Sequence, residues 1–89
     1  MECGITLKEY LILDVRTKEE YDESHVKDAV NIPYDLIDES TDIDKNFIIF
    51  VYCKSGKRAD IAKEKLESLG YNVYNLGGIN DIDLEKVGS

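Results

Sequence analysis

A run of strand-favouring apolar residues that leads through a short loop into a helix constrains the fold of this 89-residue chain more than any other feature. Residues 47–52 (FIIFVY) carry no charge, and Cys53 follows them directly. A strand that is apolar at successive positions is buried on both faces, as in a parallel sheet covered by helices. Ligands of such sheets bind beyond the carboxyl ends of the strands, beside the helix N-termini that follow. We therefore expect the chemistry of this chain at Cys53.

Other segments alternate between strand and helix patterns. Strands are predicted over residues 11–15, 29–32 and 71–76, and Pro33 ends the second. Helical segments are predicted from the capping-box pattern at residues 17–20 to about Ser24, over residues 34–37 and from Ile79, with a loop over residues 40–46. Strands that alternate with helices predict an α/β fold, a small parallel sheet with helices on both faces.

The helix after the cysteine loop has the clearest pattern. Ala59, Ala62, Leu66 and Leu69 recur at helical spacing. Gly70 stands where a left-handed residue commonly ends a helix. Because no repeat, linker or change of composition divides the chain, we expect one domain over residues 1–89.

Charge and composition exclude several classes of function. A formal net charge of −8 argues against a nucleic-acid partner, because neutralising phosphates needs a basic face. No apolar run is long enough to span a membrane. The first residues lack the basic start and apolar stretch of a signal peptide, so the sequence predicts a cytoplasmic location. Two cysteines and one histidine cannot build a four-ligand zinc site, and we predict neither metal nor cofactor.

The loop after Cys53 predicts a reactive sulfur in an anion-binding cradle. Free N–H groups at the start of the helix, together with Lys54, Lys57 and Arg58, favour the thiolate over the thiol. Gly56 lets the loop backbone turn without a side-chain clash. The alternative is that Cys53 is a small buried hydrophobic residue at the end of a strand.

Four blocks, in order along the chain, resemble the single-domain rhodaneses, the thiosulfate sulfurtransferase family. Residues 13–16 (LDVR) resemble its strand ending in Asp-Val-Arg, and residues 52–58 (YCKSGKR) its Cys-x-x-Gly-x-Arg active loop. Residues 20–33 are similar to its block from Glu-Tyr to Asn-Ile-Pro, and residues 76–79 (LGGI) to its closing glycine pair. The resemblance runs from about residue 11 to residue 79.

The chain departs from the family pattern at three places. Ser24 and Asp28 stand where two glycines are usual around the histidine, and no tryptophan follows Gly78. Few residues precede Leu11, so the N-terminal strand and helix common in the family are expected to be shortened.

The resemblance implies sulfur transfer through a covalent intermediate. Cys53 takes the outer sulfur of a small anionic donor, such as thiosulfate, as a persulfide and passes it to a thiol or cyanide. A protein sulfur acceptor is a further expected partner. The residues implied to bind the donor or shape the loop are Lys54, Ser55, Gly56, Lys57 and Arg58. Asp14 and Arg16 are implied to shape the site without joining the reaction.

Several side chains have two interpretations. Arg58 either fixes the loop or the donor oxygens, or is a solvated residue in the first helical turn. We expect Arg16 to pair with Glu20, and Asp14 to accept N–H groups from neighbouring loops. His25 is expected to make a fold-stabilising hydrogen bond rather than act as a general base, because a thiolate needs no separate base.

Two further functions compete with sulfur transfer. Cysteine phosphatases and arsenate reductases with a rhodanese fold place five residues between cysteine and arginine, whereas four intervene here, and no histidine precedes Cys53. The other rival is a persulfide carrier or regulatory binding module with little turnover.

Ser55 stands where two-domain rhodaneses carry a cation, so polysulfide is an alternative donor. Cys3 is interpreted as a plain thiol.

Overall fold

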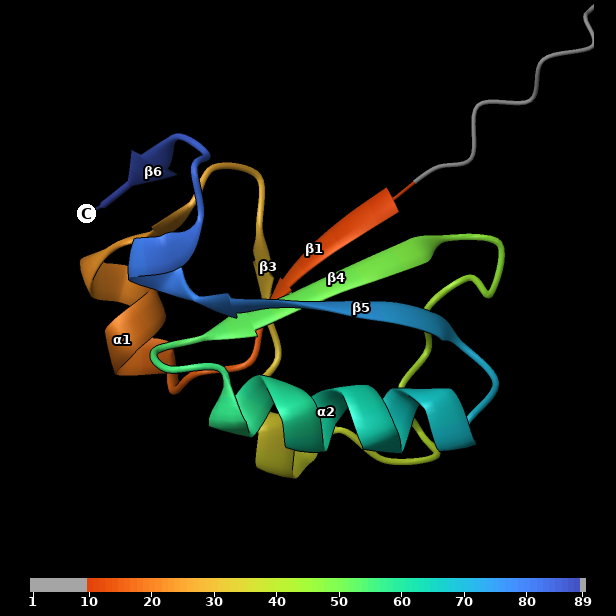
Figure 1. Cartoon of the computed structure of the whole chain (residues 1–89). Helices are drawn as coiled ribbons and strands as arrows, with labels where there is room; N and C mark the ends of the chain where they lie inside the picture. Colours follow the sequence, from red (N-terminus) through yellow and green to blue (C-terminus); the bar gives the residue numbers. More distant parts are fainter. Residues whose placement is uncertain (1–9, 89) are drawn as a thin grey trace, which may run out of the picture.

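The computed structural model describes residues 10–88, and a four-stranded parallel sheet forms its centre (Figure 1). The strands are β1 (Tyr10–Asp14), β3 (Val30–Asn31), β4 (Ile48–Cys53) and β5 (Asn72–Gly78). They lie in the order β3-β1-β4-β5, so the apolar strand β4 is an inner strand. The pairings of β1 with β3 and β4, and of β4 with β5, are all parallel. The predicted α/β class is therefore confirmed.

Helices cover both faces of this sheet, as the sequence predicts. Helix α2 (Lys57–Ser68) and the short turn η1 (Tyr34–Leu36) lie against one face. The core on that side is made by buried aliphatic residues of both layers: Leu13, Val15, Ile49, Val51, Ala59, Ala62 and Leu66. The larger of the two hydrophobic clusters lies on this face, which also carries the helix that follows Cys53.

The opposite face is covered mainly at the carboxyl ends of the strands. Helix α1 (Lys18–Glu23) and the turn η2 (Ile79–Asp81) lie there. The core on this side contains Val26, Ala29, Tyr52, Ile79 and Ile82. Toward the other end of the sheet, the ring of Phe50 contacts the rings of Tyr10 and Tyr74 on the neighbouring strands.

Local signals set the ends of the helices. The Thr17 hydroxyl accepts the Glu20 backbone N–H, and the Glu20 carboxylate accepts the Thr17 N–H, which is the predicted capping box. Gly70 follows α2 with φ 98°, the predicted left-handed position. The brief turn after Pro33 and the final turn from Ile79 are also confirmed.

Two features differ from the prediction. The strand predicted over residues 71–76 is β5, which continues through Gly77 to Gly78, because an irregularity in the pairing of β4 with β5 carries the glycine pair into the sheet. A small antiparallel ribbon, β2 (His25–Val26) with β6 (Lys86–Val87), was not predicted. Strands of two residues have no periodicity that a sequence pattern can reveal.

Three predictions are not decided by residues 10–88. The predicted role of Cys3 and the predicted shortening of the N-terminal region concern residues outside the described ones. Among the described residues, no helix has the length and apolarity needed to cross a membrane. The cytoplasmic location stays a prediction.

Candidate active site

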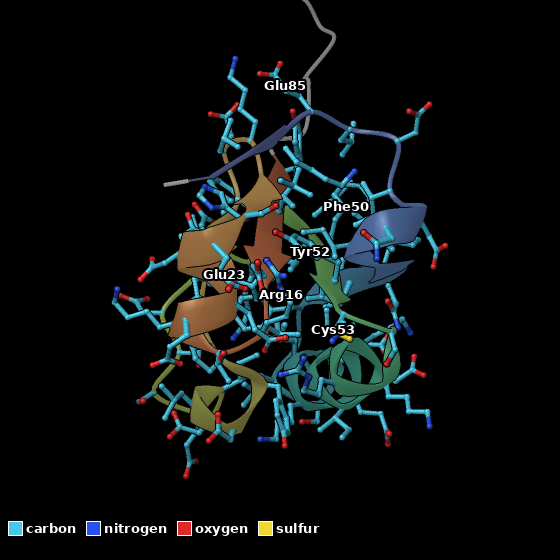
Figure 2. The ribbon with its side chains drawn as sticks, turned by 90° about the vertical axis from the view of Figure 1, so that its left-hand side faces the viewer. Arg16, Glu23, Phe50, Tyr52, Cys53 and Glu85 are labelled. Carbon is cyan, nitrogen blue, oxygen red and sulfur yellow. The ribbon has the colours of Figure 1, made fainter. Side chains whose placement is uncertain are left out.

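Cys53 is the last residue of β4 and has no exposed surface. Its Sγ accepts the Gly56 backbone N–H at 2.9 Å and the Ala59 N–H at 3.4 Å. Figure 2 shows Cys53 at the end of its strand, directly beside the start of α2. Two converging backbone N–H groups make a concave site that favours negative charge on the sulfur. Packing alone does not require these donors, so the geometry favours the reactive interpretation of Cys53.

The loop that closes on the sulfur depends on Gly56. This residue is buried, has φ 96°, and is the N-cap of α2. Positive φ of this size is accessible to glycine at little cost but strains other residues. Lys54, Ser55 and Lys57 are exposed around the loop. Gly56 therefore forms a buried turn whose N–H donates to Cys53 Sγ. The exposed residues Lys54, Ser55 and Lys57 form a rim around it.

Arg58 reaches away from the loop to helix α1. Its Nη1 lies 2.9 Å from Glu20 Oε1 and its Nη2 3.1 Å from Oε2, a bidentate ion pair. These bonds from Arg58 hold the pKa of Glu20 at about 2, below its ordinary value of 4.5. The interpretation of Arg58 as a solvated residue of the first helical turn is wrong, because the side chain is half-buried and paired with Glu20. It fixes the start of α2 to the start of α1, and any contact with donor oxygens stays a prediction.

Arg16 does not pair with Glu20, because Arg58 occupies that carboxylate and Asp14 lies closer. The Arg16 guanidinium bonds Asp14 through Nε at 3.0 Å and through Nη2 at 2.6 Å, and Nη2 also donates to the Ser24 carbonyl. Asp14 accepts the Arg16 backbone N–H at 2.9 Å, a donor of its own turn rather than of the neighbouring loops that were predicted. Both side chains are buried, so the pair braces the turn after β1.

Tyr52 completes this buried network and was not singled out by its sequence position. Its hydroxyl donates to Asp14 Oδ2 at 2.8 Å and accepts the Val26 N–H at 2.9 Å. Burial, followed by the hydrogen bond to the carboxylate, raises the pKa of Tyr52 well above its ordinary value. Figure 2 shows Tyr52 and Arg16 next to each other. Because Tyr52 directly precedes Cys53 in the sequence, the network fixes the end of β4.

His25 makes the structural contact that was predicted for it. Its Nδ1 donates to the Tyr21 carbonyl at 2.9 Å, and its ring stacks on the Tyr21 ring at 3.8 Å between centroids. The histidine therefore joins α1 to β2, and within residues 10–88 both its hydrogen bond and its ring contact are with Tyr21 rather than Cys53.

The glycine pair at the end of β5 supports the loop from its other side. A Cβ on Gly78 would lie 2.5 Å from the Lys54 carbonyl oxygen, and a Cβ on Gly56 would lie 3.4 Å from Gly77 Cα. From the sequence this pair was predicted to end a strand and matched the closing glycine pair of the family, without a contact to the cysteine loop. Its position after an apolar strand was the signal that could have linked it to the site, since glycine allows close backbone approach.

The comparisons with known proteins agree with this geometry. The family model of the rhodanese-like domain matches residues 4–85, and the chain belongs to that family. It is 43% identical over 79 residues to the thiosulfate sulfurtransferase PspE of Escherichia coli, covering 84% of this chain and 76% of PspE. A solved rhodanese with anions from E. coli has a TM-score of 0.80 at 38% identity and covers 90% of this chain and 99% of that one.

A third relative is named as a carrier. The chain is 33% identical over 61 residues to the putative sulfur carrier protein YrkF of Bacillus subtilis. This match covers 67% of this chain but only 33% of YrkF. Relatives of this domain thus include proteins named for sulfur transfer and proteins named for sulfur carriage.

Proposed function

We propose that the chain is a sulfurtransferase that moves a sulfane sulfur from thiosulfate or a polysulfide to a thiol or cyanide through a persulfide on Cys53. The observation that carries the proposal is the pair of backbone N–H groups, from Gly56 and Ala59, that converge on Sγ. They stabilise a thiolate before the reaction and a persulfide after it. Similarity to PspE supports thiosulfate as the donor.

The first half-reaction is a displacement at sulfur. The Cys53 thiolate attacks the outer sulfur of thiosulfate, a new S–S bond forms, and the bond to the inner sulfur breaks. Sulfite leaves with the bonding electron pair, so no external oxidant or reductant is consumed. In the second half-reaction a thiolate or cyanide attacks the outer sulfur of the persulfide, and Cys53 leaves as the thiolate.

The rim and the ion pair have separate roles in this proposal. Lys54 and Lys57 are exposed, so their charges attract an anionic donor over a distance. Arg58 is held by Glu20, so it keeps the start of α2 in register with α1 instead of moving with the donor. The donor therefore meets a prearranged cradle rather than one that it must order.

A persulfide carrier is the second candidate. Complete burial of Cys53 favours it, because a buried persulfide is shielded from small acceptors until a partner approaches. Similarity to YrkF points in the same direction. Such a carrier would accept sulfur readily but turn over slowly with cyanide, and its acceptor would be a protein thiol.

Intact mass after treatment with thiosulfate or polysulfide tests the proposal. We expect a gain of one sulfur atom that dithiothreitol reverses. Cys53→Ser abolishes the gain, whereas the matched variant Cys3→Ser retains it. Steady turnover with cyanide identifies an enzyme, and uptake without turnover identifies a carrier. Uptake that survives in Cys53→Ser contradicts the proposal, as does hydrolysis of p-nitrophenyl phosphate in place of sulfur uptake.

A further inference from the structure

The pairing of β4 with β5 is irregular beside the active loop. Val51 pairs with Asn75, but Cys53 pairs with Gly78, so β5 places two residues opposite one residue of β4. Gly77 lies in this bulge with φ 92°. Bulges next to functional sites re-aim side chains, and Asn75 is the last paired residue of β5 before this bulge.

The Asn75 amide makes three hydrogen bonds at this bulge. Its Nδ2 donates to the Gly56 carbonyl at 3.2 Å and to Asp60 Oδ1 at 2.7 Å. Its Oδ1 accepts the Gly77 backbone N–H at 2.7 Å. The NH2 group of Asn75 faces two acceptors and the amide oxygen faces a donor, so the orientation of the amide is fixed. One side chain therefore joins the cysteine loop, helix α2 and the bulge.

The bond to the Gly56 carbonyl bears directly on the sulfur. Gly56 donates its N–H to Cys53 Sγ, and its carbonyl accepts from Asn75 and from the Asp60 backbone N–H at 3.0 Å. Glycine has no side chain that restricts φ and ψ, and its N–H and carbonyl belong to successive peptide planes joined at Cα. Hydrogen bonds that hold the Gly56 carbonyl therefore fix one of the two planes and reduce the freedom with which the N–H can turn away from Sγ.

We infer that Asn75 is a positioning residue for sulfur transfer, which acts through Gly56 to aim the loop N–H at Cys53 Sγ. The inference rests on the proposed function. Asn75 belongs to none of the blocks that predict the site, and its contacts are with the scaffold of the loop rather than with Cys53. Loss of its donor should leave the fold intact but misdirect the cradle.

Two variants separate the donor of Asn75 from its acceptor. Asn75→Ala removes all three hydrogen bonds. Asn75→Ser keeps a hydroxyl that can accept the N–H two residues on but is too short to reach the Gly56 carbonyl. We expect sulfur uptake from thiosulfate to fall about tenfold in both variants, in line with loss of one positioning hydrogen bond.

Two readouts do not require sulfur transfer. The amide resonance of Gly56 in ¹H–¹⁵N spectra should shift in both variants, because its hydrogen bond to Sγ changes. The rate of alkylation of Cys53 by iodoacetamide at one fixed pH should change, because the Gly56 N–H no longer points at Sγ in the same way. A residue that only stabilised the fold would leave both unchanged in the folded protein.

Matched controls are available on the same elements. Asn72→Ala removes an exposed asparagine from the start of β5, and Asp60→Ala removes the other side-chain partner of Asn75 Nδ2. Both should keep uptake within about twofold of wild type and leave the Gly56 resonance near its original position.

The inference is overturned if folded Asn75→Ala or Asn75→Ser shows the same sulfur uptake, Gly56 resonance and alkylation rate as wild type. Equal effects in Asp60→Ala also overturn it, since they would assign the role to the side-chain bridge. If wild type takes up no sulfur at all, the proposed function fails, while the resonance and alkylation readouts still decide the role of Asn75.

Discussion

The ion pair between Glu20 and Arg58 predicts how stability depends on pH. Replacing Glu20 by Gln removes the charge but keeps an oxygen that can accept the Thr17 N–H, so the capping box survives. Because Arg58 lowers the pKa of Glu20 to about 2 in the folded protein, the unfolded chain binds a proton at higher pH than the folded chain. The ionised carboxylate therefore stabilises the fold above its unfolded pKa of 4.5.

The size of the effect follows from that difference. Fully retained, a lowering from 4.5 to about 2 corresponds to about 3 kcal/mol of stability at neutral pH. Both side chains are 27% exposed, so solvent screens the interaction. We expect about 1–2 kcal/mol for a bidentate pair in this setting. This contribution is present at neutral pH and is lost as the pH falls from 4.5 toward 2.

Denaturant unfolding of wild type, Glu20→Gln and Glu19→Gln across this pH range measures the effect. Glu19 is the matched control, because it is the exposed neighbour in the same helical turn. Glu20→Gln should be less stable than wild type at neutral pH, and the gap should close toward pH 2. A gap that equals that of Glu19→Gln, or one that does not change with pH, would refute the role assigned to the pair.

Three other predictions concern the loop and the network behind it. The variants Lys54→Ala and Lys57→Ala should use thiosulfate less well than wild type at low salt and equally well at high salt. The variant Arg58→Ala should be slower at every ionic strength. Measuring kcat/KM over a salt series separates the two kinds of effect. Gly78→Ala should slow sulfur uptake, since its Cβ would displace the Lys54 carbonyl, and normal uptake in the folded variant would contradict this. Tyr52→Phe should lower the free energy of unfolding by about 1–3 kcal/mol by leaving Asp14 and the Val26 N–H without the hydroxyl, a loss that thermal melts would detect.

Local patterns predicted the parts of the fold that local interactions determine. The apolar run of β4, the helical spacing in α2 and the capping box at Thr17 each appear in the structure where their residues indicated. The place of Cys53 followed as well, because the carboxyl end of a buried parallel strand and the next helix define a site together. The rhodanese-like family is shown by the match over residues 4–85.

Contacts between distant segments were not predictable in the same way. From the sequence alone, Glu20 could pair with Arg16 or with Arg58. It pairs with Arg58, which belongs to a helix that begins 37 residues after Glu20. The ribbon of β2 with β6 joins two-residue strands whose pairing no periodicity announces. The role of Asn75 depends on the bulge in β5, which exists only once the strand is paired with β4.

The burial of Cys53 also bears on how the protein withstands oxidants. Peroxide converts accessible thiolates to sulfenic acid and then, irreversibly, to sulfinic acid. A sulfur without exposed surface meets peroxide only while the loop is open, so the rate of inactivation is limited by how often the loop opens. Under the proposed function, the same opening would admit the sulfur donor. Inactivation by peroxide in the absence of donor would then measure the loop motion that sulfur uptake needs, and donor that has already loaded the site should slow irreversible loss of the cysteine.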